Sequence, residues 1–276
     1  MSVTGDEGPV VWHLTRLFRE KPLQSASQSG LNNRLGLVVL NQPLDHIGIL
    51  RRFWDNTFVH VAADGGANCV YEVGAARGDA SFDNLHVVIG DLDSLRDDVR
   101  EYFESRPHPT KVIHDPDQYA TDFGKAVRYI RNSQSTPVDI VAIGGLGGRV
   151  DQGLSQLHHL YLFQTAPRYA DGRIYLVSGE SITFLLKAGK HHIEVRGGGE
   201  EVFAKHVGIL PIKEPSRIST KGLEWDVKDW ETQFGGQLST SNHILPETEV
   251  VEVETTKDVL FTVALKRLEH CPIKPI

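Results

Sequence analysis

The sequence predicts an α/β protein in two parts: a parallel-sheet domain with helices on both faces, followed by an all-β sandwich domain. Strand-like and helix-like runs alternate between positions 35 and 164, and this alternation is typical of a parallel sheet covered by helices. After position 172, short strand-like runs separated by turn residues follow one another, which is typical of a sandwich. We expect an N-terminal extension, an α/β domain and a β domain over residues 1–34, 35–185 and 186–270.

Each element of the α/β domain is predicted from its own run of residues. The near-continuous apolar run LGLVVLN (35–41) predicts a buried strand. Thr121 predicts the start of a helix, because its hydroxyl can cap the first turn. The expected strands are 35–41, 58–64, 85–91, 111–115 and 138–145, and the expected helices are 45–56, 67–76, 96–105, 121–133 and 149–164.

The two remaining parts of the chain differ in their residue patterns. Residues 1–34 include the polar stretch KPLQSASQSGLNN, so we expect a flexible extension there, although residues 10–18 are compatible with a short helix. The strand-like runs that follow position 172 are 173–178, 181–187, 191–196, 201–212, 217–227, 249–255 and 259–266.

Composition and charge exclude several classes of protein. The chain has 276 residues, 29 Lys and Arg against 36 Asp and Glu, and a net charge of -7. Such a chain is not expected to bind nucleic acid through a broad basic face. It has no apolar run long enough to span a membrane and no secretory or mitochondrial leader pattern. Its two cysteines lack metal-ligand spacing, which fits a reducing compartment, so we expect a cytoplasmic protein.

Acidic and glycine-rich segments follow four of the expected strands: AADGGAN, GDLDS, HDPDQYATD and GGLGGRVDQ. In parallel sheets the ligand lies beyond the carboxyl ends of the strands, so these segments should meet at one edge. Asp91 and Asp93 are two residues apart in an expected strand and should face the same way. Two aspartates at a strand end can also be simple turn or capping residues. Several carboxylates together, however, call for a cation, and oxygen ligands without Cys or His suggest Mg²⁺ carrying phosphates.

Three further segments suggest phosphate or ligand binding, each with a plainer alternative. Four glycines and Arg149 open the helix at 149–164, where the guanidinium could hold a phosphate or form a surface salt bridge. Asp122 and Lys125 share a helix face, so Lys125 could contact phosphate or simply pair with Asp122. The turn at Asp64 can let a ligand approach the backbone or be an ordinary tight turn.

Seven short motifs together resemble the thiamine pyrophosphokinase family, especially its eukaryotic form. The motifs are LNQPLD (40–45), ADGGAN (63–68), GDLDS (90–94), PDQYATDFGKA (116–126), GGLGGRVDQ (144–152), GLEW (222–225) and STSN (239–242). The resemblance implies that the α/β domain binds nucleotide and the β domain binds thiamine. It implies transfer of a pyrophosphoryl group from Mg²⁺-ATP to the hydroxyl of thiamine, giving thiamine diphosphate and AMP, and a homodimer with shared active sites.

The same motifs supply the candidate site residues. The candidate catalytic residues are Asp91, Asp93, Asp122, Lys125, Arg149 and Asp151, of which Asp91, Asp93 and Asp122 are the candidate Mg²⁺ ligands. The residues expected at the nucleotide are Asp64, Gly65, Gly66, Asn68, Gln118, Thr121, Gly145, Gly148 and Gln152. Those expected at thiamine are Trp225, Ser239, Ser241 and Asn242. Asp151 could orient the thiamine hydroxyl or accept its proton, and the sequence does not separate that role from metal binding.

Two other functions fit part of the pattern. Another α/β nucleotide-dependent phosphotransferase could use the same carboxylates, and a catalytically silent protein could bind thiamine or nucleotide. GLEW and STSN in the β domain disfavour the first alternative, and the intact set of Asp, Lys and Arg residues disfavours the second.

Overall fold

A computed structural model of the chain describes residues 8–19, 34–197 and 201–266. The described residues form two compact units, which divide between Gly179 and Glu180. Residues 34–179 make the α/β unit, whereas residues 8–19 join 180–197 and 201–266 in the β unit. In the described residues, none of the helices combines the length and the apolar character required to cross a membrane.

Six parallel strands form the sheet of the α/β unit. They are β2 (Leu35–Val39), β3 (Val59–Ala63), β4 (Val87–Gly90), β5 (Lys111–His114), β6 (Asp139–Ile143) and β7 (Ile174–Val177), in the spatial order β7-β6-β2-β3-β4-β5. All five residues of β2 are buried, as expected for a strand covered on both faces. The order reverses between β2 and β6, and this reversal is where ligands of open α/β sheets bind.

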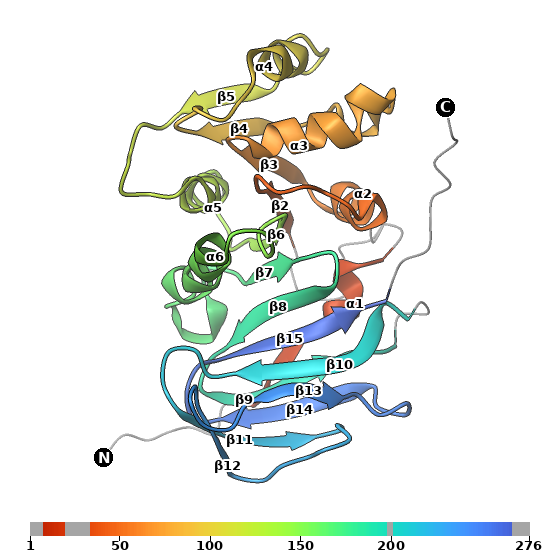
Figure 1. The fold of residues 1–276 in the computed structure, drawn as a ribbon, viewed down its shortest axis with the longest axis vertical. Helices are drawn as coiled ribbons and strands as arrows, with labels where there is room; N and C mark the ends of the chain where they lie inside the picture. Colours follow the sequence, from red (N-terminus) through yellow and green to blue (C-terminus); the bar gives the residue numbers. More distant parts are fainter. Residues whose placement is uncertain (1–7, 20–33, 198–200, 267–276) are drawn as a thin grey trace. The chain divides into compact units, whose positions relative to one another are not determined.

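Helices cover both faces of this sheet, as the sequence predicts. They are α2 (Ile47–Asn56), α3 (Gly66–Val73), α4 (Asp97–Glu104), α5 (Asp122–Asn132) and α6 (Val150–Leu162), and η1 (Ala75–Arg77), η2 (Ala80–Phe82) and η3 (Pro167–Tyr169) are short 3-10 turns. Figure 1 shows α5 and α6 on the left of the sheet and α2 and α3 on the right. Thr121 is the N-cap of α5, accepting a hydrogen bond from the amide of Gly124 at 3.1 Å, so this predicted cap is confirmed.

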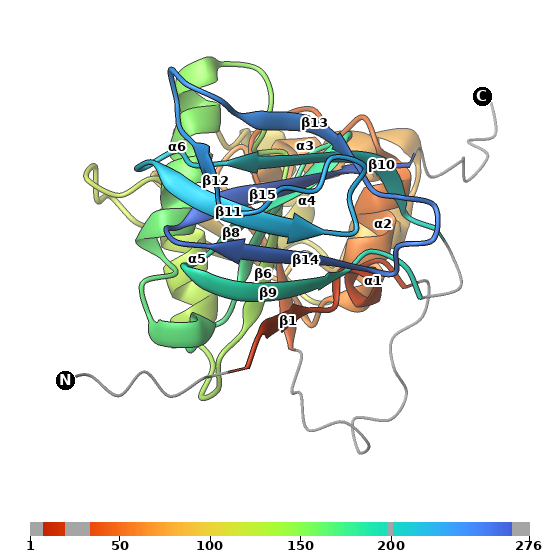
Figure 2. The same cartoon turned by 90° about the horizontal axis from the view of Figure 1, so that it is seen from below.

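The β unit contains two sheets. One has the antiparallel strands β13 (Ser239–His243), β10 (Phe203–Leu210), β15 (Val259–Leu265) and β8 (Ser181–Leu186), in that order. The other has the order β1 (Val10–Trp12), β9 (Gly189–Glu194), β14 (Val250–Thr255), β11 (Ser216–Lys221) and β12 (Trp230–Thr232). Figure 2 shows β9, β14 and β11 in front of β8, β15 and β10, so the predicted all-β sandwich is confirmed.

The expectation of a flexible extension over residues 1–34 is wrong for residues 8–19. Strand β1 pairs in parallel with β9, and the short helix α1 (Leu14–Leu17) follows it. Trp12 and Phe18 are almost completely buried, with the ring of Phe18 edge-on to Phe203. An apolar segment of three or four residues carries no periodic signal, so its partner β9, far along the chain, decides its structure. Residues 1–7 and 20–33 of the extension lie outside the described residues.

The division between the units also falls earlier than the predicted boundary after residue 185. The boundary expected from the sequence lies inside β8, whereas the compact units separate at residue 179. Strand β8 pairs with β15 along its whole length, from Ser181 opposite Ala264 to Leu186 opposite Val259. This long-range pairing assigns β8 to the β unit.

Candidate active site

A cavity of about 670 Å³ lies at the carboxyl ends of the central strands of the α/β unit. Residues that end or follow β2, β3, β4, β5 and β6 line it, together with residues of the first turn of α5 and the first two turns of α6. The lining residues are Leu40, Asn41, Gln42, Ala63, Asp64, Asp91, Asp93, Ser94, Asp117, Gln118, Tyr119, Ala120, Thr121, Asp122, Phe123, Gly144, Gly145, Arg149, Gln152, Ser155 and Gln156. The predicted meeting of four strand-end segments at one edge is therefore observed.

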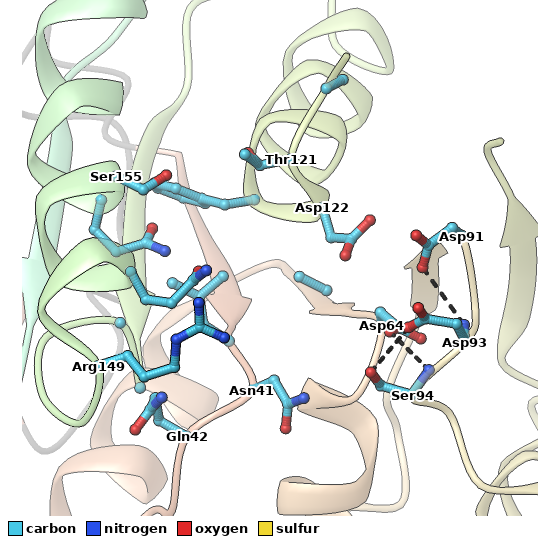
Figure 3. A pocket seen from close by; sticks show the side chains of 18 of the residues that line it. Asn41, Gln42, Asp64, Asp91, Asp93, Ser94, Thr121, Asp122, Arg149 and Ser155 are labelled. Carbon is cyan, nitrogen blue, oxygen red and sulfur yellow. Dashed lines mark hydrogen bonds between the residues drawn. The ribbon is translucent and has the colours of Figure 1, made fainter. Parts of the chain in front are cut away.

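Three carboxylates gather at one side of this cavity. Asp64, Asp91 and Asp93 each offer an oxygen, and these three oxygens lie within 4.8 Å of one another. Figure 3 shows the three side chains together, with Asp122 projecting toward the same region from α5. A set of oxygen donors this close is suited to a hard divalent cation.

Asp91 and Asp93 come together for a reason that differs from the expected one. Strand β4 ends at Gly90, so neither aspartate lies in a strand. Leu92 between them has a left-handed backbone with φ of 63°, and the amide of Asp93 donates to Oδ1 of Asp91 at 3.4 Å. Left-handed conformations of non-glycine residues are costly and cluster at functional sites. A turn, not strand alternation, thus holds these two carboxylates together.

Asp64 is the buried member of the three carboxylates. It is only 4% exposed, and its two oxygens accept hydrogen bonds from the amides of Ser94 and Leu95, each at 3.1 Å. Burial raises the pKa of Asp64, and the charges of Asp122 and Asp93 raise it further, against the lowering effect of Ser94. A bound cation would offset this mutual repulsion. The sequence led us to expect Asp64 at the nucleotide, whereas its geometry matches a metal ligand.

Gly90 allows the carboxylates of two different elements to approach each other. A Cβ atom at Gly90 would lie 2.7 Å from Cβ of Asp64 and 3.0 Å from Oδ1 of Asp122. Both distances are too short for an unstrained contact, so a side chain at position 90 would displace one of the two aspartates. The absence of a side chain at Gly90 therefore lets Asp64 and Asp122 pack close together.

Lys125 is buried beneath the cavity wall. Its side chain is 1% exposed, and Nζ donates to Oδ1 of Asp122 at 3.1 Å. Lys125 is absent from the cavity lining, so the described geometry matches the Asp122–Lys125 pair and not a direct phosphate contact. The buried ammonium compensates the charge of Asp122 from behind.

Arg149 lies on the α6 side of the cavity, away from the three carboxylates (Figure 3). Its guanidinium donates from Nε and Nη2 to the two oxygens of Asp151, at 3.1 and 2.6 Å. This hydrogen-bonded partner lowers the pKa of Asp151. Both side chains are exposed, so the pair is weak and the arginine can exchange its partner for a ligand anion. Asp151 itself does not line the cavity.

Several predicted residues support the cavity from behind its surface. A Cβ at Gly65 would lie 2.4 Å from Nδ2 of Asn41, and one at Gly66 would lie 2.2 Å from the carbonyl of Val39. These glycines thus let α3 start close to the end of β2. Asn68 donates to the carbonyl of Ser94 and accepts from the amide of Arg96, which anchors the loop that follows the acidic turn.

The structure brings together most of the predicted nucleotide and metal residues, but not all. The cavity is lined by Asp64, Asp91, Asp93, Gln118, Thr121, Asp122, Gly145, Arg149 and Gln152, and not by Gly65, Gly66, Asn68, Lys125, Gly148 and Asp151. Gly148 has φ of 62° and packs against the side chain of Gln42. Sequence reasoning missed the lining residues Asn41, Gln42, Ser94, Ser155 and Gln156. The position of Asn41 and Gln42 just after a buried strand is a signal that could have identified them.

A second, smaller cavity of about 270 Å³ lies in the β unit, lined by Ile218, Thr220, Trp225, Val227, Trp230, Leu238, Ser239, Thr240, Ser241 and Asn242. Trp225 is 54% exposed, so it is not a core residue of the sandwich. The four residues predicted at thiamine, Trp225, Ser239, Ser241 and Asn242, all line this one cavity. An indole face beside hydroxyl groups is suited to a flat cationic ligand.

Asn242 is buried and its amide is engaged by the backbone of Trp225. Oδ1 of Asn242 accepts from the amide of Trp225 at 3.1 Å, and Nδ2 donates to the carbonyl of Trp225 at 2.9 Å. The same Oδ1 also accepts from the amide of His243. Asn242 therefore holds the turn that carries Trp225, and it also lines the cavity.

Comparisons with known proteins match both units of the chain. Residues 50–170 match the family "Thiamin pyrophosphokinase, catalytic domain", and residues 190–260 match "Thiamin pyrophosphokinase, vitamin B1 binding domain". The chain is 36% identical to thiamine pyrophosphokinase 1 of Arabidopsis thaliana over 259 residues, covering 89% of this chain and 91% of that protein.

Solved structures give the same result. The thiamin pyrophosphokinase of Candida albicans has a TM-score of 0.71 at 26% identity, covering 85% of this chain and 90% of that one. The yeast thiamin pyrophosphokinase has a TM-score of 0.79 at 23% identity, covering 95% and 94% of the two chains, and supports the fold. With both domain families matched in order along the sequence, the chain belongs to the thiamin pyrophosphokinase family.

Proposed function

We propose that the chain transfers the pyrophosphoryl group of ATP to the hydroxyl of thiamine, giving thiamine diphosphate and AMP. Family membership supports the reaction. The observation that carries it is the cavity whose one side holds three carboxylates within 4.8 Å of one another and whose α6 side holds Arg149. A chain of phosphates needs positive charge along its whole length. A cation held by the three carboxylates would supply it at one end, and Arg149 would supply it at the other.

We propose Mg²⁺ as the divalent metal of this site. The donors are all carboxylate oxygens, which Mg²⁺ prefers, and it commonly binds through one or two carboxylates plus substrate phosphates. Asp91, Asp93 and the buried Asp64 would hold the ion, with Asp122 beside them. When bound, the metal would neutralise phosphate charge and polarise the phosphoryl oxygens. This assignment adds Asp64 to the ligands expected from the sequence.

The remaining residues act by position and charge. Nucleophilic attack of the thiamine hydroxyl on the β-phosphorus expels AMP, so the chain must hold the phosphates in line and stabilise the departing charge. Arg149 is placed to take a phosphate in its planar fork when it releases Asp151. Asp151 then keeps the empty guanidinium oriented between turnovers. Lys125 fixes the carboxylate of Asp122 through the 3.1 Å hydrogen bond.

Thiamine is proposed to occupy the β-unit cavity. The thiazolium would lie against the indole of Trp225, and the hydroxyls of Ser239 and Ser241 would bond its polar groups. Asn242 supports this arrangement by holding the backbone of Trp225. A Trp225→Ala variant should therefore raise KM for thiamine far more than KM for ATP.

A homodimer with shared sites is also proposed. The exposed face of α6 carries Val150, Leu154 and Leu162, which are 78%, 56% and 48% exposed and share one side of the helix. Such an apolar stripe beside the catalytic cavity suits contact with a second copy of the chain. In the proposed dimer, the β unit of one copy brings thiamine to the catalytic cavity of the other. We further propose a cytoplasmic location, supported by the sparse cysteine content.

Subunit mixing tests the shared site. Trp225→Ala subunits and Asp91→Asn subunits should each show little activity at a thiamine concentration far below the raised KM of the first variant. They should regain part of the activity when combined, because one site of each mixed dimer is intact at both positions. Verified mixed dimers without recovery would show that each site is built within one subunit.

The reaction itself is tested by product analysis. Purified protein with ATP, Mg²⁺ and thiamine should form thiamine diphosphate and AMP in equal amounts, and omission of thiamine or metal should stop both. AMP release without thiamine would identify a different phosphotransferase. Saturable thiamine binding with no AMP would identify a silent binding protein.

A further inference from the structure

His159 is a buried histidine of α6 that has no role in the reaction described above. It is 4% exposed and stands behind the cavity wall, since it does not itself line the cavity. Its imidazole packs near the rings of Phe123 and Phe163, with centroids 5.1 and 5.7 Å away. A phenyl ring would fill such an apolar environment equally well, so the presence of the two imidazole nitrogens of His159 needs an explanation.

The partners of the two nitrogens define one tautomer. Nδ1 lies 2.6 Å from the carbonyl oxygen of Ser155, which can only accept, so Nδ1 carries the proton. Nε2 lies 2.7 Å from Oγ1 of Thr121 and, in the neutral ring, must accept the hydroxyl proton. His159 therefore joins α6 to the N-cap residue of α5.

The bond to His159 fixes what the Thr121 hydroxyl offers to the cavity. A hydroxyl has one proton to donate and two lone pairs. The proton is directed to Nε2 of His159, and one lone pair accepts from the amide of Gly124 at 3.1 Å. Thr121 lines the cavity, and only its second lone pair is left to face a ligand.

We propose that His159 is a positioning residue that sets the hydrogen-bonding polarity of Thr121, making it an acceptor toward the bound nucleotide. In this state Thr121 can receive an N–H or O–H group of the base or ribose but cannot donate to a phosphate oxygen. The same bond holds the first turn of α5, which carries Asp122, against α6, which follows Arg149. The proposal rests on the nucleotide binding proposed above for this cavity.

Protonation of His159 would reverse this polarity. The imidazolium donates from Nε2 as well, so Oγ1 of Thr121 would accept twice and turn its own proton to the cavity. Burial is the largest influence that lowers the pKa of His159. The nearby titratable groups, His158 on α6 and Arg128 on α5, lower it further. The imidazole of His159 is therefore neutral at neutral pH. The hydrogen-bonding polarity of Thr121 is reversed only in acid solution, where His159 is protonated.

Nitrogen NMR of the intact protein tests the tautomer without reference to activity. With ¹⁵N-labelled histidine, His159 should show a protonated Nδ1 and an unprotonated Nε2 at pH 7.5, assigned by the loss of its signals in His159→Phe. A protonated Nε2 at this pH would overturn the proposal. Thr121→Val should shift the Nε2 resonance, because it removes the donor.

Kinetics with matched variants test the positioning role. His159→Phe keeps the ring packing but removes the acceptor, and we expect kcat/KM for ATP to fall about five-fold or more, as for the loss of one buried hydrogen bond. The control is His108→Phe, because His108 is exposed and lies neither in α6 nor in the cavity lining, and it should behave as wild type. Thr121→Val should cause a loss of similar size, and the double variant should lose no more than either single variant. Full activity in a folded His159→Phe protein would overturn the proposal.

A pH profile and two nucleotide analogues separate positioning from packing. In the wild type, kcat/KM for ATP should fall as His159 is protonated in acid, and this ionisation should be missing in His159→Phe. The penalty of Thr121→Val should vanish with 2′-deoxy-ATP if the donor is the ribose, or with inosine triphosphate if it is the adenine amino group. A penalty that persists with both analogues, or identical pH profiles for wild type and His159→Phe, would contradict the proposed polarity. A protein with no transferase activity would fail only the kinetic arms and leave the NMR test intact.

Discussion

The indole of Trp12 donates a hydrogen bond from Nε1 to Nδ1 of His191 at 3.1 Å, although the two residues are 179 positions apart in the sequence. Nε2 of the same histidine lies 2.7 Å from the carbonyl oxygen of Lys187, to which it donates. Trp12 is fully buried, and its ring centroid lies 4.4 Å from that of Phe184. The N-terminal strand is therefore part of the core of the β unit.

Trp12→Ala is expected to destabilise the protein strongly. Removing a fully buried tryptophan side chain leaves a cavity and takes away the donor to Nδ1 of His191, which together lower the free energy of unfolding by about 3–5 kcal/mol. The control is Val11→Ala, because Val11 lies in the same strand but is 37% exposed. Urea unfolding should separate the two variants clearly. Equal stability of both would show that β1 contributes little to the unit.

Gly90→Ala is expected to lower activity more than stability. The added methyl group would lie 2.7 Å from Cβ of Asp64 and 3.0 Å from Oδ1 of Asp122, so the carboxylates must separate. We expect weaker activation by Mg²⁺ in a metal titration of the rate. Gly153→Ala in α6 is the matched control, because its Cβ meets nothing within 4 Å and the change favours a helix by roughly 0.5–1 kcal/mol. Unaltered metal dependence in Gly90→Ala would contradict the packing argument.

Asp91→Asn and Asp93→Asn should nearly abolish turnover while leaving the fold intact. A neutral amide replaces a charged ligand of the proposed Mg²⁺, and both residues are at the surface of the cavity. Asp64→Asn should have the same effect, in contrast to Asn substitution of an exposed acidic residue such as Asp98. The measurement is the rate at limiting Mg²⁺, with circular dichroism as the check on folding. Near-normal rates for any of the three would remove that residue from the metal site.

Arg149→Lys is expected to lower kcat/KM by roughly ten-fold or more, or about 1.4 kcal/mol of transition-state stabilisation. Lysine keeps the charge but lacks the planar fork that binds two oxygens at once. Arg96→Lys is a suitable comparison, since Arg96 is an exposed arginine whose fork binds Asp98, away from the cavity. If the two substitutions leave kcat/KM equally unchanged, Arg149 serves only its surface pair with Asp151.

The stability of the α/β unit should fall in mild acid because of His60. This histidine is 2% exposed, and burial lowers its pKa from 6.5 to about 4. The unfolded chain then binds a proton below pH 6.5 that the folded chain does not take up until about pH 4, so stability decreases as the pH falls through this window. The full loss corresponds to about 3 kcal/mol.

His60→Gln isolates this contribution from that of His86 and His159, whose pKa values are also lowered by burial. Urea unfolding at pH 7.5, 6 and 4.5 should show a smaller acid loss in the variant than in the wild type. Parallel curves for the two proteins would assign the acid sensitivity to other groups.

The fold of the α/β unit and the identity of most cavity residues could be predicted from the sequence, because these signals are local. The apolar run at 35–39 predicts a buried strand. Asp64 and Asp91 follow strands whose carboxyl ends must lie at the same edge of a parallel sheet. The turn residue Leu92 shows why the agreement is incomplete. It brings Asp91 and Asp93 together through a left-handed backbone that leucine gives no reason to expect.

The features that the sequence did not reveal depend on distant partners. The spacing leaves Lys125 open to a phosphate contact or to a pair with Asp122, and the packing of α5 buries its ammonium beside Asp122. Asn242 is predicted as a contact for thiamine, and the sequence does not reveal that its amide also holds the backbone of Trp225. Lysine and asparagine are both residue types that often bind ligands. Only the tertiary contacts decide whether such a side chain contacts the ligand or supports another residue that contacts it.

The pairing of β1 with β9 has a consequence for how the protein is made on the ribosome. Trp12 is opposite Ile193 in the two strands, so the N-terminal strand emerges long before its partner exists. At typical synthesis rates of about 5–20 residues per second, it must wait on the order of ten to forty seconds. The α/β unit can be completed during that interval, whereas the β unit closes only after β9 has been translated. Until then the nascent chain carries an unpaired apolar strand, with Trp12 exposed, that a chaperone could bind.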